Sequence, residues 1–508
     1  MLAKLIEDLL VFGVHHQMMD ELDVPQVRNQ LFSLLKVTEP YEGQVTGTID
    51  ETPVALLKAI VEEALAQGLI GNSGTEKDIL DAKVMAQLMP RQSELKRIYE
   101  DIKKTDGVEA ATDYYYHLSQ MSNYIRTDRI ALNKYWQTST AYGNLEITIN
   151  LSKPEKDPKD IEKAKLMPTS NYPKCFLCIE NVGYEGRINH PARSNHRVLP
   201  LQLNGEDWYL QYSPYVYYNE HAIIFKASHE PMKLCKETFV RLTDFVEAMP
   251  HYFIGSNADL PIVGGSILSH DHFQGGHHRF PMVDAKVLKA YGSKTYEEVS
   301  IKMIEWPLSV IRLASKNKEQ LVDMAYEIYE AWKVYKDESV GILAFTNTEG
   351  EPLAHNTVTP IARMNDAGEF EVDLALRNNR RSKAHPDGIF HPHEHLHHIK
   401  KENIGLIEVM GLAVLPARLN DDRLILGQVL TGDKTLADIE ATLPHHLSWM
   451  EDIVSKTGNK LSSEAALTTI EEAIGQRFAQ VLECAGVYKQ TDEGIKAFDA
   501  FITSLACM

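Results

Sequence analysis

The feature that most constrains the fold is a change from helical to strand-like hydrophobic periodicity after residues 1–150. Within this first region, ETPVALLKAIVEEALAQGLIG places Thr52 as an N-cap, Pro53 at the first helical position and Gly68 near the helix end. Further helix-like segments continue to about Tyr142. The sequence therefore predicts a helical N-terminal region followed by a unit of a different kind.

The next segment is an exposed connection between Leu151 and Pro173, because it crowds Pro, Lys and Asp. Beyond it, DWYLQYSPYVYYNEHAIIFKAS is rich in aromatic and β-branched residues, as strands are. The helix-like KETFVRLTDFVEAMPHYF and then LPIVGGSILSHDHF follow, so we expect strand, helix and strand, with the histidines at the end. A second strand-rich passage has a turn at 366–368, and the tail from about Asp433 is helical.

These patterns predict an α+β protein with two antiparallel-sheet units, each with helices, and helical regions at both ends. The expected parts are a helical N-terminal region at 1–150, sheet units at 171–290 and 291–430, and a helical C-terminal region at 431–508.

Composition narrows the class of protein. The chain has 508 residues, 44% of them hydrophobic, enough for a folded, soluble protein with a sizeable core. Its net charge of -19 disfavours nucleic acid and anionic membranes as partners. The sequence contains no apolar run near the roughly 18 residues that a membrane span needs. Five cysteines, an odd number, indicate a reducing cytoplasm and no disulfide framework.

A histidine-rich stretch, GGSILSHDHFQGGHH at 264–278, is the first candidate site. Taken alone it is also compatible with a solvated turn. In an extended segment His270, His272 and Gln274 face the same side, because the side-chain period of a strand is two. A neutral imidazole is a competent nucleophile toward phosphorus, and glycines let the backbone approach a phosphate. The combination favours phosphoryl or nucleotidyl transfer.

The segment KCFLC offers a second candidate, a Cys-x-x-Cys pair at Cys175 and Cys178. Such a pair suits one tetrahedral soft-metal site, and His229 and His270 are available as the remaining ligands. An unliganded buried pair and a redox pair are the alternatives, although the surrounding pattern is not that of a parallel βαβ unit.

The motifs KCFLC, YYNEH, FKASH and SHDHFQ, in this order, resemble those of the galactose-1-phosphate uridylyltransferases, a family of the histidine-triad superfamily. The long helical N-terminus resembles the second, Gram-positive-type class of the family. The resemblance is strong from about Asn171 to His278 and extends through the rest of the chain. It implies that both sheet units are of the histidine-triad type and that the protein is a cytoplasmic homodimer.

Carried over residue by residue, the resemblance implies that His272 is the nucleophile that becomes uridylylated and that Gln274 holds a phosphate oxygen. It implies a structural zinc ion whose ligands are Cys175, Cys178, His229 and His270. Asn219 matches a nucleoside-contacting asparagine and Asn257 a phosphate-contacting one.

Other residues suit a phosphate on general grounds. The backbone of Gly264, Gly265 and Ser266 offers N–H donors. The guanidinium groups of Arg377 and Arg380 suit phosphate oxygens, although a cluster of arginines is also compatible with a solvated turn.

The implied reaction converts UDP-glucose and galactose 1-phosphate into glucose 1-phosphate and UDP-galactose, a step of galactose breakdown. Two alternatives remain open at this level. A nucleotide hydrolase or phosphorylase of the same superfamily would share the histidine motif and pass the nucleotide to water or inorganic phosphate. A metal-dependent binding protein would use all of the histidines as ligands.

Two features depart from the better-known class of the family. Asp271 stands where that class has proline, and one extra residue separates Gly-Gly-Ser from His270. A second histidine-rich stretch, IFHPHEHLHHIKK, matches a region that helps bind a second metal, but the accompanying glutamate is not found. A polar strand is the alternative there, so a second metal stays open, as do the roles of His391, His393, His395, His397 and His398.

Overall fold

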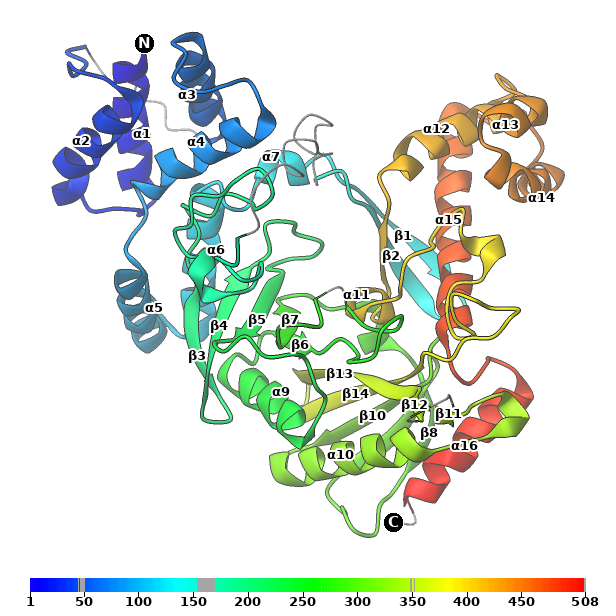
Figure 1. Cartoon of the computed structure of the whole chain (residues 1–508). Helices are drawn as coiled ribbons and strands as arrows, with labels where there is room; N and C mark the ends of the chain where they lie inside the picture. The colour runs from blue at the N-terminus through cyan, green and yellow to red at the C-terminus, as the bar shows by residue number, and fades with distance from the viewer. Residues whose placement is uncertain are drawn as a thin grey trace. The chain divides into compact units, whose positions relative to one another are not determined.

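The computed structural model describes residues 1–43, 45, 51–152, 170–265, 267–347, 350 and 352–506, and Figure 1 shows its helices and strands. Residue contacts divide the chain into two compact units. Unit 1 consists of Met1–Leu132, Ser152–Glu230 and His270–His272. Unit 2 consists of Asn133–Leu151, Pro231–Ser269 and Phe273–Met508. The four-part division expected from the sequence stays a prediction.

Unit 1 begins with a run of helices. The longest of them bury one apolar side, as α1 does with Leu2, Ile6, Leu9 and Leu10. This confirms the prediction of a helical N-terminal region as far as residue 130. The helices are α1 (Leu2–His15), η1 (Glu21–Asp23), α2 (Val24–Leu35), α3 (Val54–Ala66), α4 (Gly74–Ala86), α5 (Gln92–Asp106), α6 (Val108–Met121) and α7 (Thr127–Ile130).

The start of α3 differs from the prediction by one residue. Pro53 is the N-cap and not the first helical residue, and its carbonyl accepts a hydrogen bond of 2.9 Å from the N–H of Leu57. Gly68 follows the helix with a φ of +71, which glycine adopts without strain. Most of the expected connection, at 153–169, lies outside the described residues.

A three-stranded antiparallel meander forms the sheet of unit 1, from β3 (Leu199–Leu203) to β4 (Glu206–Tyr212) and β5 (Ala222–Lys226). Asn204 and Gly205, both with positive φ, make the tight turn between β3 and β4. Trp208 on β4 is fully buried. The strand prediction for this segment is confirmed.

Unit 2 contains a larger antiparallel sheet with the order β7-β6-β13-β14-β10-β9-β8, to which β7 contributes its residues from Phe273 onward. Helices α9 (Lys236–Ala248) and α10 (Lys318–Val334) pack against its central strands, as Figure 1 shows. Helix α9 confirms the helix predicted from KETFVRLTDFVEAMPHYF. The predicted turn at 366–368 is also confirmed, because it connects β13 to β14. The strands are β6 (Phe253–Gly255), β7 (His272–Gly276), β8 (Val287–Tyr291), β9 (Ser300–Ile304), β10 (Val310–Ser315), β13 (Asn356–Met364) and β14 (Phe370–Asn378).

The expectation of helices up to about Tyr142 is wrong for its last part. Strands β1 (Lys134–Thr140) and β2 (Gly143–Ile149) form a hairpin there, and β15 (Leu412–Leu415) pairs in parallel with β2. Helix α15 (Ser463–Ala485) covers this small sheet. Because the partners of the hairpin lie more than 250 residues away in the sequence, local periodicity does not reveal it.

The C-terminal region is helical, as predicted. The α+β class with antiparallel sheets and helical terminal regions is likewise confirmed. Among the residues that the structure describes, no helix is long and apolar enough to cross a membrane. The remaining elements are η2 (Ile179–Asn181), η3 (Pro281–Asp284), η4 (Glu338–Val340), β11 (Phe345–Thr346), β12 (Leu353–Ala354), η5 (Glu394–Leu396), α11 (Leu406–Val409), α12 (Arg418–Thr431), α13 (Leu436–Thr442), η6 (Pro444–His446), α14 (Leu447–Thr457) and α16 (Asp492–Ala506).

Candidate active site and metal centre

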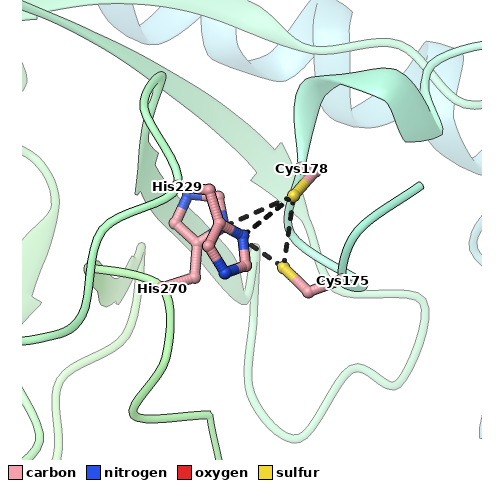
Figure 2. A group of neighbouring side chains, drawn as sticks. All are labelled: Cys175, Cys178, His229 and His270. Atoms are coloured by element: carbon pink, nitrogen blue, oxygen red, sulfur yellow. Dashed lines mark hydrogen bonds between the residues drawn. The ribbon is translucent and has the colours of Figure 1, made fainter. Parts of the chain in front are cut away.

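Three separate segments of unit 1 bring together the four predicted metal ligands. Cys175 and Cys178 immediately precede η2, His229 follows β5, and His270 lies just before β7. Figure 2 shows the two sulfur atoms and the two imidazole rings pointing toward one another. The predicted set Cys175, Cys178, His229 and His270 is thus a possible metal-binding group.

The distances within this Cys2His2 cluster suit a tetrahedral ion. The two sulfur atoms lie 3.4 Å apart, Cys175 Sγ lies 3.2 Å from His270 Nδ1, and Cys178 Sγ lies 3.2 Å from His229 Nδ1. Zinc bonds of about 2.3 Å to sulfur and about 2.0–2.1 Å to nitrogen, at tetrahedral angles, place ligand atoms about 3.3–3.8 Å apart. The donor set therefore suits a tetrahedral soft metal ion, and the ligand atoms would move apart by a few tenths of an ångström to accept one of zinc's size.

Hydrogen bonding favours metal binding by His270. Burial, followed by the adjacent Cys175, raises the pKa of the Cys178 thiol to about 12, so a bound cation has to displace the proton of this thiol. His270 Nε2 lies 2.8 Å from the carbonyl oxygen of Lys226, to which it donates. The Nδ1 of His270 then keeps its lone pair for the metal, an orientation typical of metal-bound histidines.

Asn181, which the sequence analysis did not identify, holds the cysteine loop in shape. Its Nδ2 donates to the carbonyl oxygens of Cys175 and Cys178, each at 2.8 Å. Its Oδ1 lies 2.6 Å from His190 Nε2, which donates to it, and burial lowers the pKa of His190 to about 4, so this ring is neutral. An amide three residues after the second cysteine was the available sequence signal.

We expect Asn181→Ala to weaken metal binding by about 10–100-fold, the usual effect of losing a partner that orients metal ligands. The variant removes the donor that the carbonyl oxygens of Cys175 and Cys178 share, so we expect the cysteine loop to lose its shape. Competition with a chelating dye measures the affinity. Asn189→Ala, at an exposed asparagine eight residues farther along the chain, is the control and should bind metal as the wild type does. Unchanged affinity in Asn181→Ala would contradict this role.

His272, the predicted nucleophile, is the first residue of β7 and is 6% exposed. The strand starts at this residue, so His270 lies outside it, and the expectation of a strand ending in the histidines is wrong. His272 Nδ1 lies 2.8 Å from the carbonyl oxygen of His270. Burial lowers the pKa of His272 to about 4, which favours the neutral imidazole.

Gln274 lies two residues farther along β7, opposite Gly255 of β6, and is half-buried. Because side chains in a strand alternate, Gln274 and His272 project from the same face of β7. That these two side chains act together stays a prediction.

The predicted substrate contacts occupy varied settings. Asn219 is exposed and donates to Glu220 Oε1 at 3.2 Å. Asn257 is buried, and its Oδ1 accepts a 3.0 Å hydrogen bond from the N–H of Leu406 at the start of α11. A Cβ on Gly265 would lie 2.8 Å from Asn257 Nδ2, and one on Gly264 would lie 2.2 Å from the carbonyl oxygen of Ala258. Close packing therefore favours glycine at both positions, in addition to the predicted phosphate contact. Ser266 lies outside the described residues.

The two predicted arginines contact the protein's own oxygen atoms. Arg377 is fully buried on β14 and donates to the carbonyl oxygen of Ile404 at 2.8 Å and to Thr359 Oγ1 at 3.3 Å. Arg380 donates to the carbonyl oxygen of Gly341. Their role as phosphate partners stays a prediction.

The histidines of the second histidine-rich stretch contact different neighbouring groups and do not converge on one point. His391 Nε2 lies 3.3 Å from Asn403 Oδ1, and His393 Nε2 lies 3.1 Å from the carbonyl oxygen of Ile389. The rings of His393 and His395 are 6.3 Å apart. Within the described part of the chain, neither residue belongs to a group of three or more candidate metal ligands.

An α+β fold in which a buried imidazole lies two residues after a candidate metal ligand is a framework that suits a histidine-dependent nucleotidyltransferase. Comparisons with known proteins agree. Residues 18–231 match the family model "Galactose-1-phosphate uridyl transferase, N-terminal domain", and residues 245–425 match its C-terminal domain.

Three relatives named galactose-1-phosphate uridylyltransferase align with almost the whole chain. The protein of Caldanaerobacter subterraneus is 52% identical over 98% of this chain and 96% of its own length. The protein of Halalkalibacterium halodurans is 49% identical over 99% of both chains. That of Bacillus subtilis is 46% identical over 98% of this chain and 97% of its own. The chain therefore belongs to the galactose-1-phosphate uridylyltransferase family, a family of nucleotidyltransferases.

Proposed function

We propose that the protein exchanges UMP between UDP-glucose and galactose 1-phosphate through a uridylyl-histidine on His272. The observation that supports this most is the 2.8 Å contact between His272 Nδ1 and the carbonyl oxygen of His270. Because a carbonyl oxygen only accepts, Nδ1 bears the proton of the neutral ring and Nε2 keeps a lone pair. The proposed nucleophilic atom is therefore Nε2.

In the first step, Nε2 of His272 attacks the α-phosphorus of UDP-glucose. The new bond joins nitrogen to phosphorus, and the bond from the α-phosphorus to the bridging oxygen breaks. Glucose 1-phosphate leaves with that oxygen and its electron pair. The ring then bears a positive charge, which the Nδ1–H shares with the carbonyl oxygen of His270, so the hydrogen bond becomes stronger as charge develops.

In the second step, a phosphate oxygen of galactose 1-phosphate attacks the same phosphorus. The bond between nitrogen and phosphorus breaks, UDP-galactose forms, and His272 returns to its neutral state. No net proton is gained or lost by the enzyme. Dividing one displacement into two steps lets the same imidazole serve both sugar phosphates.

The other predicted residues complete the proposal. Gln274, on the same face of β7, would donate its amide to a phosphate oxygen of the intermediate. Asn219 would contact the nucleoside. Phosphate contacts would come from Asn257, Gly264, Gly265, Ser266, Arg377 and Arg380.

We further propose that the metal of the Cys2His2 cluster is zinc and that its role is structural. Two thiolates and two imidazoles are the ligand set of closed structural zinc sites. When bound, zinc would link the cysteine loop, the segment after β5 and the segment before β7. His270 would then be held by its Nδ1, and its carbonyl oxygen would be kept in place for His272. The homodimer and the cytoplasmic location are proposals that rest on the resemblance.

Intact-protein mass spectrometry tests the exchange. We expect the purified protein to gain the mass of one uridylyl group when mixed with UDP-glucose alone, and to lose it when galactose 1-phosphate is added. Peptide mapping should locate the group on His272. An adduct that water or inorganic phosphate discharges equally fast would favour the hydrolase or phosphorylase alternative. No adduct and intact UDP-glucose would reject the exchange with this substrate.

A further inference from the structure

A second group of candidate metal ligands lies in the C-terminal helical region of unit 2. Asp422 belongs to α12, and His445 and His446 end the short helix η6. One ligand atom of each residue lies within 4.8 Å of those of the other two. These residues are separate from the Cys2His2 cluster and from the residues proposed for catalysis.

His446 has a ring nitrogen whose hydrogen-bonding capacity is not met. The ring is 0% exposed, and its Nε2 lies 3.3 Å from Oδ2 of Asp422, which is 7% exposed. A carboxylate accepts, so Nε2 donates, and Nδ1 then holds a lone pair. Nδ1 is buried and has no hydrogen-bond partner among the described residues. Buried polar atoms without a partner are rare in proteins, so this one requires an explanation.

His398, from the second histidine-rich stretch, shows the same feature beside it. Its ring lies 5.2 Å from the ring of His446, and it is 8% exposed. Its Nε2 is buried without a hydrogen-bond partner among the described residues. Both rings are therefore incompletely hydrogen-bonded within the described part of the chain, and they lie next to the group formed by Asp422, His445 and His446.

An ordinary ion pair explains only part of this arrangement. Arg418 Nη1 lies 3.3 Å from Oδ2 of Asp422, one turn away on α12, and accounts for the charge of the carboxylate. It offers nothing to the bare nitrogens of His446 and His398. His445, in contrast, is exposed. An ion from solvent can therefore bind first to His445 and then reach the two buried ligands.

We propose that Asp422, His445 and His446 bind a divalent transition-metal ion of the zinc type, with His398 beside them as a further imidazole. Two imidazoles and a carboxylate are ligands that such ions prefer, whereas calcium and magnesium prefer oxygen alone. The ion would join α12 to η6, which are separated along the chain by α13. This inference does not depend on the proposed transfer reaction.

Cobalt titration of the full-length protein, first stripped of metal with a chelator, distinguishes the two centres. Cobalt bound to thiolates gives an intense charge-transfer band in the near ultraviolet, and cobalt bound only to nitrogen and oxygen does not. We expect two equivalents of cobalt to bind, one with the thiolate band and one without it. His445→Ala should lose the equivalent without the band and keep the other. His15→Ala, an exposed histidine in α1, is the matched control and should keep both.

A second variant protects the test against a folding defect. Asp422→Asn keeps the shape of the buried side chain and should also lose the equivalent that lacks the thiolate band, with circular dichroism confirming the fold. Binding of one equivalent in the wild type, with the thiolate band, would overturn the proposal. So would two equivalents in both His445→Ala and Asp422→Asn. One equivalent without the band would support this site and contradict the Cys2His2 centre instead.

Discussion

Replacing His272 by glycine is expected to abolish the exchange of UMP, with a loss of at least about 10⁴-fold in turnover. The variant removes the one nitrogen that the hydrogen bond to the carbonyl oxygen of His270 leaves free to attack phosphorus. Binding of UDP-glucose should persist, because the other proposed contacts are intact. Initial rates of UDP-galactose formation measure the loss, and equilibrium binding of UDP-glucose shows whether the site remains.

Two further variants make the result specific. His272→Asn keeps part of the buried volume and should be equally inactive, so that a cavity alone does not explain the loss. His15→Asn, at an exposed position of α1, should turn over like the wild type. Turnover of His272→Gly near the wild-type rate, in a protein with an unchanged circular dichroism spectrum, would reject the assignment of the nucleophile.

Cys178→Ser is expected to remove the metal of the Cys2His2 cluster and to lower activity by about 10–100-fold. Serine is a poor ligand for a soft metal, and Cys178 contacts both Cys175 and His229. Without the ion, three segments of unit 1 lose their common link, and the carbonyl oxygen that orients His272 loses its anchor. Metal content of the purified protein, its melting temperature and its turnover should all decrease together.

The matched control is Cys484→Ser, a free cysteine of α15 outside the cluster. It should keep the full metal content and the wild-type melting temperature. A full equivalent of metal in Cys178→Ser would contradict the proposed ligand set. Loss of metal without loss of activity would instead restrict the role of the ion to stability.

Much of the secondary structure could be predicted, because it follows from local patterns. Local periodicity or turn residues mark the strands around Trp208, helix α9 and the turn at 366–368. The hairpin of β1 and β2 could not, since it gains its stability from β15 and α15, which come much later in the chain.

The sequence by itself determined the chemistry available to this protein. Two cysteines three residues apart, three histidines and a glutamine, in motifs that resemble those of a known family, were enough to identify the candidate ligands and the proposed nucleophile. Only the tertiary structure decided how these groups are oriented. Cys175 and His270 are 95 residues apart in the sequence and 3.2 Å apart in space.

The same holds for the smaller details on which the proposed reactivity depends. The nitrogen of His272 that stays free depends on a carbonyl oxygen, and the shape of the cysteine loop depends on Asn181. The group formed by Asp422, His445 and His446 joins elements that no motif connects. Hydrogen bonds and burial arise from contacts between distant segments, so residue types and spacing alone do not specify them.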